Sequence, residues 1–256
     1  MDLHLKGKRA AVLGGTRGIG RAIAEGLVAE GASLAICARN KAEVEAAVAA
    51  FEKAGTTAYG ETLDIADGEG VKAFVGHAAE SLGGLDIAIA NATASTVGNT
   101  TIEWKAMLDI DILGLVSLIE AAQPFLEAAA AKHGDAAILA ISSVSAVASY
   151  RPSAYGAMKG ALIHLVKGYA RSLAAKKIRA NAISPGATYF EGGYWAEVEK
   201  ERPEDFKSMM DASPLGRMAT PHEIADAALF LVSSRASIIT GANLIADGAY
   251  TTRANY

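Results

Sequence analysis

Residues 10–20 read Ala10-Ala11-Val12-Leu13-Gly14-Gly15-Thr16-Arg17-Gly18-Ile19-Gly20, an apolar run that leads through a glycine-rich turn into a helical pattern. Glycines at such a turn let the backbone approach a pyrophosphate, and the N-terminus of the following helix supplies N–H donors and the positive end of its dipole. Gly14 and Gly18 are separated by two more residues than the first two glycines of the G-x-G-x-x-G pattern, but the same physics applies. A glycine-rich hairpin is the alternative interpretation. The strand-turn-helix context favours a dinucleotide site formed by Gly14, Thr16, Arg17, Gly18, Ile19 and Gly20.

The rest of the chain alternates short apolar runs with longer helical patterns. Strands are expected at Ala10–Leu13, Ser33–Cys37, Thr57–Thr62, Asp86–Ala90, Ala136–Ile141, Arg179–Ser184 and Asn243–Ala246. Helices are expected at Ile19–Glu30, Lys41–Ala54, Glu69–Leu82, Trp104–Lys132 (in one piece or two), Ala154–Lys176 and Pro221–Ser233. Continuous apolar runs are typical of strands buried on both faces. The alternation predicts one doubly wound α/β domain over residues 1–256, with about seven parallel strands and helices on both faces of the sheet.

Composition narrows the possible partners and compartments. The net charge is −4 and the basic residues are scattered, which argues against a nucleic-acid ligand. Cys37 is the single cysteine, so no disulfide can form within the chain, and a reducing, cytoplasmic compartment is expected. The N-terminus lacks a signal-peptide pattern and no apolar run approaches ~18 residues, so we expect no membrane span. The five histidines are dispersed and no cluster has metal-ligand spacing, so we expect no metal site.

The end of the second predicted strand bears on which nicotinamide cofactor binds. An acid about 20 residues after the glycine turn would hold the ribose 2′-hydroxyl of NAD, whereas a basic residue suits the 2′-phosphate of NADP. Here the strand ends in Ala38-Arg39-Asn40, and Arg17 in the turn supplies a second cation. Because arginine binds phosphate with a planar fork of donors, we predict NADP(H). The alternative is that Arg39 is a solvated residue at a strand end.

A tyrosine and a lysine stand four residues apart in Tyr155-Gly156-Ala157-Met158-Lys159. Pro152 favours a helix that starts near Ser153, and positions i and i+4 share one face of a helix. The Lys159 ammonium would then lie beside the Tyr155 hydroxyl, and a nearby cation favours the phenolate. Such a tyrosine can donate or accept a proton near neutral pH. The pair alone would equally suit a surface lysine beside a half-buried tyrosine, but together with the glycine turn it indicates an acid/base site.

Taken together, these motifs resemble the short-chain dehydrogenase/reductase family, classical type, from about Lys6 to Gly248. The resemblance implies a Rossmann fold in which Tyr155 is the catalytic acid/base, Lys159 assists it and anchors the ribose, and a serine hydrogen-bonds the carbonyl oxygen. Ser142, Ser143 and Ser145 are candidates; strand alternation lets only one of the first two reach the site, and the family pattern favours Ser143. The resemblance further implies a homotetramer or homodimer, and cofactor contacts from Asp64, Asn91, Tyr155, Lys159, Pro185, Gly186 and Thr188.

One departure from the family bears on mechanism. Asp111 stands where the family usually has an asparagine that holds a water between the catalytic lysine and solvent. An ionised carboxylate only accepts hydrogen bonds. It could pair with Lys159 and oppose the effect of that cation on Tyr155, or mimic the amide when protonated. The alternative is an isostere without functional meaning. We count Asp111 among the candidate catalytic residues.

The segment 187–220 is expected to be the one long irregular stretch of the chain and is predicted to be a substrate lid. Four aromatic residues fall between Tyr189 and Trp195, and we expect Phe190, Tyr194 and Trp195 to contact a bulky apolar or ring-bearing substrate. Alternatively, these side chains belong to a lid helix that packs on its own domain. The acidic residues of this segment would repel an acidic acyl carrier protein, although the basic pair Lys176-Lys177 keeps that partner open.

These observations favour an NADP(H)-dependent oxidoreductase that transfers a hydride between the nicotinamide and a carbonyl or secondary alcohol. Its partner would be a small molecule, a bulky apolar or ring-bearing ketone. Reduction of a 3-oxoacyl thioester, carried on acyl carrier protein or coenzyme A, is an alternative within the same chemistry. An alternative of another class is a non-catalytic NADP-binding sensor or scaffold.

Overall fold

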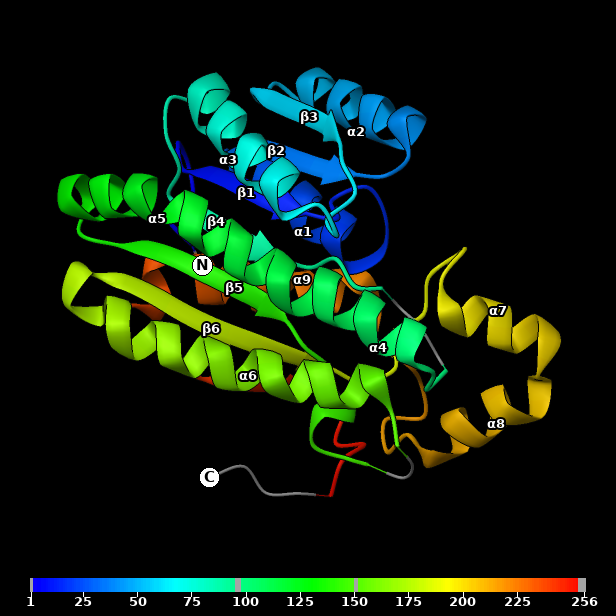
Figure 1. Ribbon diagram of the computed structural model, residues 1–256. Helices are drawn as coiled ribbons and strands as arrows, with labels where there is room; N and C mark the ends of the chain where they lie inside the picture. Colours follow the sequence, from blue (N-terminus) through cyan, green and yellow to red (C-terminus); the bar gives the residue numbers. More distant parts are fainter. Residues whose placement is uncertain (1, 95–97, 150–151, 253–256) are drawn as a thin grey trace.

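Seven parallel strands form one sheet in the computed structural model, which describes residues 2–94, 98–149 and 152–252 (Figure 1). The strands are β1 (Arg9–Leu13), β2 (Ser33–Ala38), β3 (Ala58–Thr62), β4 (Ile87–Ala90), β5 (Ala136–Ile141), β6 (Ile178–Pro185) and β7 (Asn243–Ala246). Their order across the sheet is β3-β2-β1-β4-β5-β6-β7, and every neighbouring pair is parallel. The direction of winding reverses between β1 and β4, the point where doubly wound sheets bind ligands beyond the carboxyl ends of their strands. The predicted fold is confirmed.

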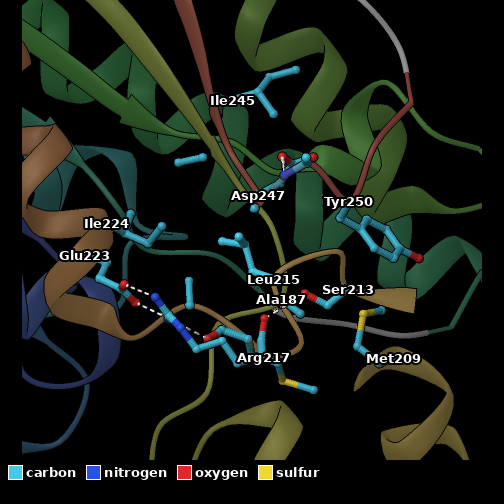
Figure 2. A pocket seen from close by; sticks show the side chains of 15 residues that line it. Ala187, Met209, Ser213, Leu215, Arg217, Glu223, Ile224, Ile245, Asp247 and Tyr250 are labelled. Carbon is cyan, nitrogen blue, oxygen red and sulfur yellow. Dashed lines mark hydrogen bonds and ion pairs between the residues drawn. The ribbon is translucent and has the colours of Figure 1, made fainter. Parts of the chain in front are cut away.

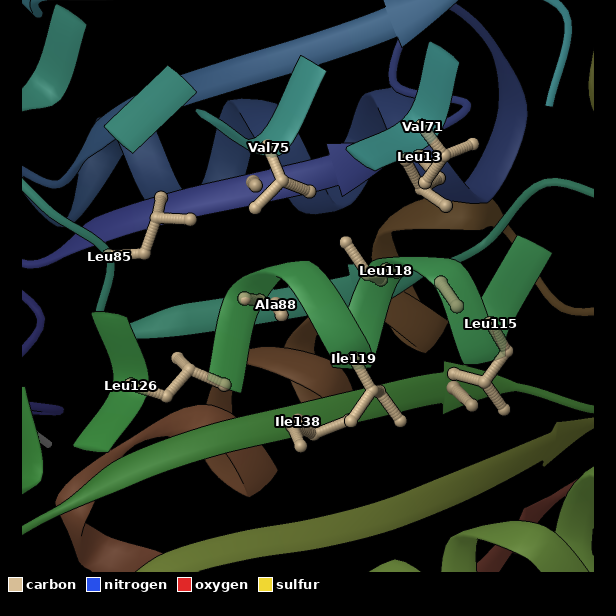
Figure 3. Packing of buried hydrophobic residues seen from close by; sticks show 14 of the residues in the cluster. Leu13, Val71, Val75, Leu85, Ala88, Leu115, Leu118, Ile119, Leu126 and Ile138 are labelled. Atoms are coloured by element: carbon tan, nitrogen blue, oxygen red, sulfur yellow. The ribbon is translucent and has the colours of Figure 1, made fainter. Parts of the chain in front are cut away.

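Helices cover both faces of the sheet (Figure 1). One face packs against α1 (Gly18–Ala29), α2 (Lys41–Lys53) and α9 (Pro221–Val232), and the other against α3 (Gly68–Leu82), α5 (Gly114–His133) and α6 (Ala154–Leu173). Successive β1 residues Val12 and Leu13 belong to the two different apolar clusters, because side chains of a strand alternate between faces. Figure 3 shows the cluster on the face covered by α3, α5 and α6. In it, Leu13 and Ile138 of the sheet lie among Val75 of α3 and Leu118 of α5.

Capping residues set where the helices that carry the site begin. The Ser153 side chain accepts a hydrogen bond from the backbone N–H of Gly156 at 3.2 Å, and so caps α6 at the place that Pro152 predicts. This start puts Tyr155 and Lys159 in the first two turns of α6. Asn40 caps α2 in the same way, through the N–H of Glu43.

The segment 187–220 contains two helices, so the expectation of an irregular stretch was wrong. They are α7 (Tyr194–Glu201) and α8 (Pro203–Ala212). Proline is favourable in the first turn of a helix, and Phe206, Met209 and Met210 recur at helical spacing. The helical signal was therefore present, but each helix is too short to make it prominent.

The helix expected at Trp104–Lys132 is three segments: α4 (Thr101–Met107), a π-helical segment at Leu108–Leu113, and α5. The whole stretch, Thr101–His133, has the length and mean hydropathy (1.4 over its most apolar window) of a membrane span. The sequence did not suggest a span, because the apolar residues of this stretch do not form one uninterrupted run. Within this fold 44% of that window is buried, and its apolar side packs as a core helix. The π-helical segment contains Asp111, whose side chain it leaves buried; π-helical turns recur at functional sites.

Candidate active site

A cavity of about 1360 Å³ lies at the carboxyl ends of the strands. It brings together nearly all of the predicted site residues, which lie in separate stretches of the chain and meet only after folding. Those that line it are Gly14, Thr16, Arg17, Gly18, Ile19, Arg39, Asp64, Asn91, Ser143, Tyr155, Lys159, Pro185, Gly186, Thr188, Phe190, Tyr194 and Trp195. Gly20 and Asp111 are the two predicted residues that do not line it.

The glycine turn is shaped by close backbone contacts. Gly14 and Gly18 have φ values of +79° and +56°, a region that side chains other than hydrogen disfavour. A Cβ on Gly20 would collide with the Gly14 carbonyl and the Asn91 amide. The Asn91 side chain donates a hydrogen bond to that same carbonyl at 2.8 Å. Gly20 is therefore needed for packing, and Asn91 braces the turn that faces the cavity.

Phe190 packs on the glycine turn. A Cβ on Gly18 would lie 2.7 Å from the tip of the Phe190 ring, and a Cβ on Gly193 would lie equally close. The ring therefore links the segment that carries α7 to the cofactor turn. Phe190 still lines the cavity, but at the glycine turn.

Charged side chains line the end of the cavity formed by β2 and the turn. Arg17 and Arg39 are exposed there. Glu43, which sequence reasoning missed, also lines it and accepts a hydrogen bond from the Thr16 hydroxyl at 2.9 Å. Its position in the first turn of α2, three residues after the cap Asn40, was the available signal. The two arginines favour an anion at this end, and the Glu43 carboxylate partly offsets them.

The serines after β5 have different partners. The Ser142 hydroxyl is buried and donates to the Lys159 carbonyl oxygen at 2.9 Å. The Ser143 hydroxyl accepts from the backbone N–H of Ser145 at 3.1 Å and lines the cavity. With an acceptor role already filled, the Ser143 O–H can still donate to a ligand oxygen.

Tyr155 and Lys159 lie one turn apart on α6, as the spacing requires. The Lys159 ammonium nitrogen is 5.7 Å from the centroid of the Tyr155 ring. It donates a hydrogen bond to the Ile141 carbonyl oxygen at 2.8 Å. Its second neighbour is Asp111, whose Oδ1 atom lies 2.9 Å from the nitrogen. The lysine is therefore held between the end of β5 and the π-helical segment.

The outer wall of the cavity is aromatic. Tyr194 and Trp195 of α7 form an edge-to-face pair with centroids 5.3 Å apart. Met209 of α8, which the sequence suggested as apolar surface on the substrate side, lines the same cavity. Sequence reasoning missed Trp104 and Tyr250, which line it from α4 and the C-terminal segment. No local pattern marks these two, because they approach the site only through the tertiary fold. Tyr189 does not line the cavity; its hydroxyl donates to Glu199, and this hydrogen bond raises the pKa of the phenol.

A smaller cavity of about 280 Å³ adjoins the main one (Figure 2). Ala187, Met209 and Tyr250 line both. Figure 2 shows the paired side chains of Arg217 and Glu223 on one side of it. The Arg217 guanidinium lowers the pKa of the Glu223 carboxyl to about 2. Among the residues that the structure describes, no group of three or more His, Cys, Asp or Glu side chains is arranged to hold a metal ion.

The doubly wound sheet, the glycine turn at its switch point and the serine, tyrosine and lysine around one cavity define an oxidoreductase that uses a nicotinamide dinucleotide. A family model described as enoyl-(acyl carrier protein) reductase matches residues 14–251. The chain belongs to the short-chain dehydrogenase/reductase family. The resemblance drawn from the sequence is thereby confirmed.

Relatives with known activities share the whole length of the chain. Isoepoxydon dehydrogenase of Penicillium expansum is 36% identical, and the match covers 95% of each protein. The L-sorbose reductase of Gluconobacter frateurii, solved with NADPH and L-sorbose, has a TM-score of 0.89 and 30% identity, covering 99% of this chain and 100% of that one. A 7α-hydroxysteroid dehydrogenase, solved with NADH and 7-oxo glycochenodeoxycholic acid, has a TM-score of 0.89 and 29% identity, covering 99% and 98%. The two solved enzymes hold different cofactors, NADPH in one and NADH in the other, and different substrates.

Proposed function

We propose that this protein is an NADP(H)-dependent reductase or dehydrogenase that acts on a carbonyl or secondary alcohol of a bulky apolar or ring-bearing substrate. One observation carries the proposal: Ser143, Tyr155 and Lys159 line a single cavity together with the glycine turn. Proton-transfer groups and a dinucleotide cradle on one cavity are the minimum that this reaction needs.

The residues present fit a nicotinamide dinucleotide. The left-handed glycines Gly14 and Gly18 and the start of α1 form a turn that a diphosphate can approach closely. Arg17 and Arg39 would hold a 2′-phosphate, which supports NADP(H) over NAD(H). Pro185, Gly186 and Thr188, at the end of β6 and beyond it, would flank the nicotinamide, with Asp64 and Asn91 at other parts of the cofactor. When bound, the cofactor supplies or accepts the hydride.

The protein's own side chains would carry out the proton transfer. The Tyr155 hydroxyl gives its proton to the carbonyl oxygen during reduction, or takes one from the alcohol during oxidation. Ser143 donates a hydrogen bond to the same oxygen and orients it. Lys159, held by Ile141 and Asp111, contributes a fixed cation near the phenol and can bind the ribose. Tyr155 thus performs the chemistry while Ser143 and Lys159 position and polarise.

The cavity wall supports an apolar, ring-bearing substrate. Trp104, Tyr194, Trp195, Met209 and Tyr250 present aromatic and thioether surface to the cavity. The solved hydroxysteroid dehydrogenase holds a bulky ring system on the same fold. We infer that the segment 187–220, with α7 and α8, acts as the substrate lid, and that the protein works in the cytoplasm as a homotetramer or homodimer.

A screen tests this function. The protein is incubated with NADPH and, separately, with NADH against aromatic, alicyclic and 3-oxoacyl ketones, and oxidation of the cofactor is followed. Turnover of ring-bearing ketones with NADPH is expected. Turnover confined to 3-oxoacyl thioesters would favour the alternative substrate, an acyl group carried on acyl carrier protein or coenzyme A. Against that alternative, Lys176 of the basic pair is already bound to Glu127 at 2.6 Å. Cofactor binding without turnover of any ketone would favour a sensor or scaffold.

A further inference from the structure

A buried ion pair joins Lys159, which lines the cavity, to Asp111, which does not. The Asp111 and Lys159 side chains are 0% and 2% exposed, with Oδ1 and the ammonium nitrogen 2.9 Å apart. The other carboxylate oxygen, Oδ2, accepts a hydrogen bond from the backbone N–H of Ala94 at 3.1 Å. Among the described residues Oδ1 has no aligned hydrogen-bond donor, so its contact with the lysine is an ion pair rather than a directed hydrogen bond. The protein therefore fixes the carboxylate in place from both sides.

We propose that Asp111 is the internal counter-ion of Lys159 and keeps Tyr155 protonated to a higher pH than a neutral residue at position 111 would. The lysine nitrogen is 5.7 Å from the Tyr155 ring centroid and 2.9 Å from Asp111. The carboxylate therefore lies no more than about 9 Å from the centroid of the ring; Asp111 and Lys159 are buried, whereas Tyr155 is half-buried and faces the cavity. At that distance its charge opposes formation of a phenolate, while the lysine charge favours it.

The size of the effect follows from Coulomb's law. A unit charge about 9 Å away, at an effective dielectric constant of about 20, shifts a proton equilibrium by about one pH unit. Lys159 has two partners in this place, Asp111 and the Ile141 carbonyl oxygen, and the carbonyl oxygen remains to hold the ammonium group when position 111 is neutral. The pair presents Tyr155 with opposed charges rather than a lone cation.

This balance has a functional consequence, which rests on the proposed function. Reduction of a ketone needs the protonated phenol as proton donor, whereas oxidation of an alcohol needs the phenolate as acceptor. By holding the proton on Tyr155, Asp111 biases the enzyme toward reduction near neutral pH. Asp111 acts on the reaction through Lys159 and Tyr155 and is thus a positioning residue.

Other charged groups stay constant in the comparison that tests the proposal. Asp109 lies on the same π-helical segment but pairs with Lys105 of α4 at 2.9 Å and is 24% exposed. Asp64 and Glu197 line the cavity from the loop after β3 and from α7. None of these groups is altered when position 111 alone is changed. Asp109→Asn removes the same charge two residues away and serves as the matched control.

The experiment is a tyrosinate absorbance titration of the protein without substrate. Because the chain has eight tyrosines, each protein is compared with the same protein carrying Tyr155→Phe, and the difference reports Tyr155. Asp111→Asn should lower the midpoint by about one pH unit, while Asp109→Asn and Asp111→Glu leave it near the unmodified value. Coincident midpoints for the unmodified protein and Asp111→Asn would overturn the proposal, as would an equal shift in Asp109→Asn. If Asp111→Asn lacks the native circular dichroism spectrum, Asp111→Ser is the second neutral variant, with the same expected shift.

A kinetic arm separates this proposal from the proposed function. In Asp111→Asn the limb of kcat/KM that falls with rising pH in reduction, and the limb that rises with pH in oxidation, should both move to lower pH, with cofactor affinity little changed. The limb reports the coupled cluster rather than one residue. A shifted titration midpoint in a protein that turns over no ketone would keep the counter-ion role and reject the proposed function. Turnover with unshifted limbs and midpoints would do the reverse.

Discussion

At the scale of single residues, the cofactor preference depends on a few charges at one end of the cavity. Arg17 and Arg39 bring two cations there, and Glu43 brings one anion bound to Thr16. The preference is therefore a difference between opposing contacts rather than the result of one arginine. Among the similar structures, one enzyme holds NADPH and another holds NADH, so the same fold can bind either cofactor.

Replacing one of these cations should reveal its share. In the unmodified protein NADPH should bind at least about tenfold more tightly than NADH, because a charged contact to the 2′-phosphate supplies ~1.4 kcal/mol or more. Arg39→Ala should remove most of that difference when both dissociation constants are measured by fluorescence. Arg171→Ala, an exposed change on α6 away from the cavity, is the control. Equal affinities in the unmodified protein would contradict the assignment to NADP(H).

The hydroxyl of Tyr155 should be indispensable for turnover. Tyr155→Phe keeps the ring and removes only the transferable proton, so kcat should fall by roughly 10²–10⁴-fold while NADPH affinity stays nearly unchanged. Tyr169→Phe, on the same helix and outside the cavity, should retain activity. Steady-state rates and equilibrium binding for the three proteins check this. Substantial activity in Tyr155→Phe would mean that another group supplies the proton.

At the scale of elements, the glycine turn and α1 depend on contacts that leave no room for a methyl group. Gly20 faces the Gly14 carbonyl and the Asn91 amide across the turn. In contrast, Gly76 in α3 has open space around the position of a Cβ. Close packing therefore requires a glycine at position 20, whereas no neighbouring atom requires one at position 76.

Substitution of these two glycines by alanine should change the free energy of unfolding in opposite directions. Gly20→Ala should lower the free energy of unfolding by about 1–3 kcal/mol through overpacking, and should weaken cofactor binding by displacing the turn. Gly76→Ala should raise it by roughly 0.5–1 kcal/mol, because alanine loses less backbone freedom in a helix. Urea denaturation with and without NADPH measures both. A neutral Gly20→Ala would show that the turn can shift to accept the side chain.

The elements also show how far the sequence predicts the structure. All seven strands and the first helices lie within a residue or two of their expected ends, because two-sided burial and capping residues such as Ser153 and Asn40 are local signals. The π-helical segment around Asp111 and the short helices α7 and α8 were not predicted, since their signals are weak or depend on packing. Similarly, Glu43 and Trp104 reach the cavity from elements that sequence patterns alone do not bring together.

At the scale of the whole molecule, Arg179 ties three distant parts of the chain together. From β6 its buried side chain forms an ion pair with Asp135 at 2.8 Å. It also donates to the carbonyl oxygens of Leu231, Val232 and Ser233, which end α9. One guanidinium thus connects the start of β5, the strand β6 and the helix that covers one face of the sheet.

Loss of this connection should destabilise the protein without touching the site. Arg179→Met would leave Asp135 and the carbonyl oxygens at the end of α9 without their partner, so we expect the free energy of unfolding to fall by about 3–5 kcal/mol. Arg171→Met, exposed on α6, should change it by less than about 0.5 kcal/mol. Urea denaturation followed by circular dichroism measures the two values. A loss below about 1 kcal/mol for Arg179→Met would contradict this role.

The two tryptophans of the chain give the molecule an optical property. Trp104 and Trp195 both line the cavity, from α4 and α7, and the sequence contains no other indole. Reduced nicotinamide absorbs light in the range where indole emits, so the entire tryptophan emission originates beside the place where the cofactor and substrate would meet. The protein therefore carries a built-in reporter: quenching and energy transfer should register occupancy of either half of the cavity in real time, without an attached dye.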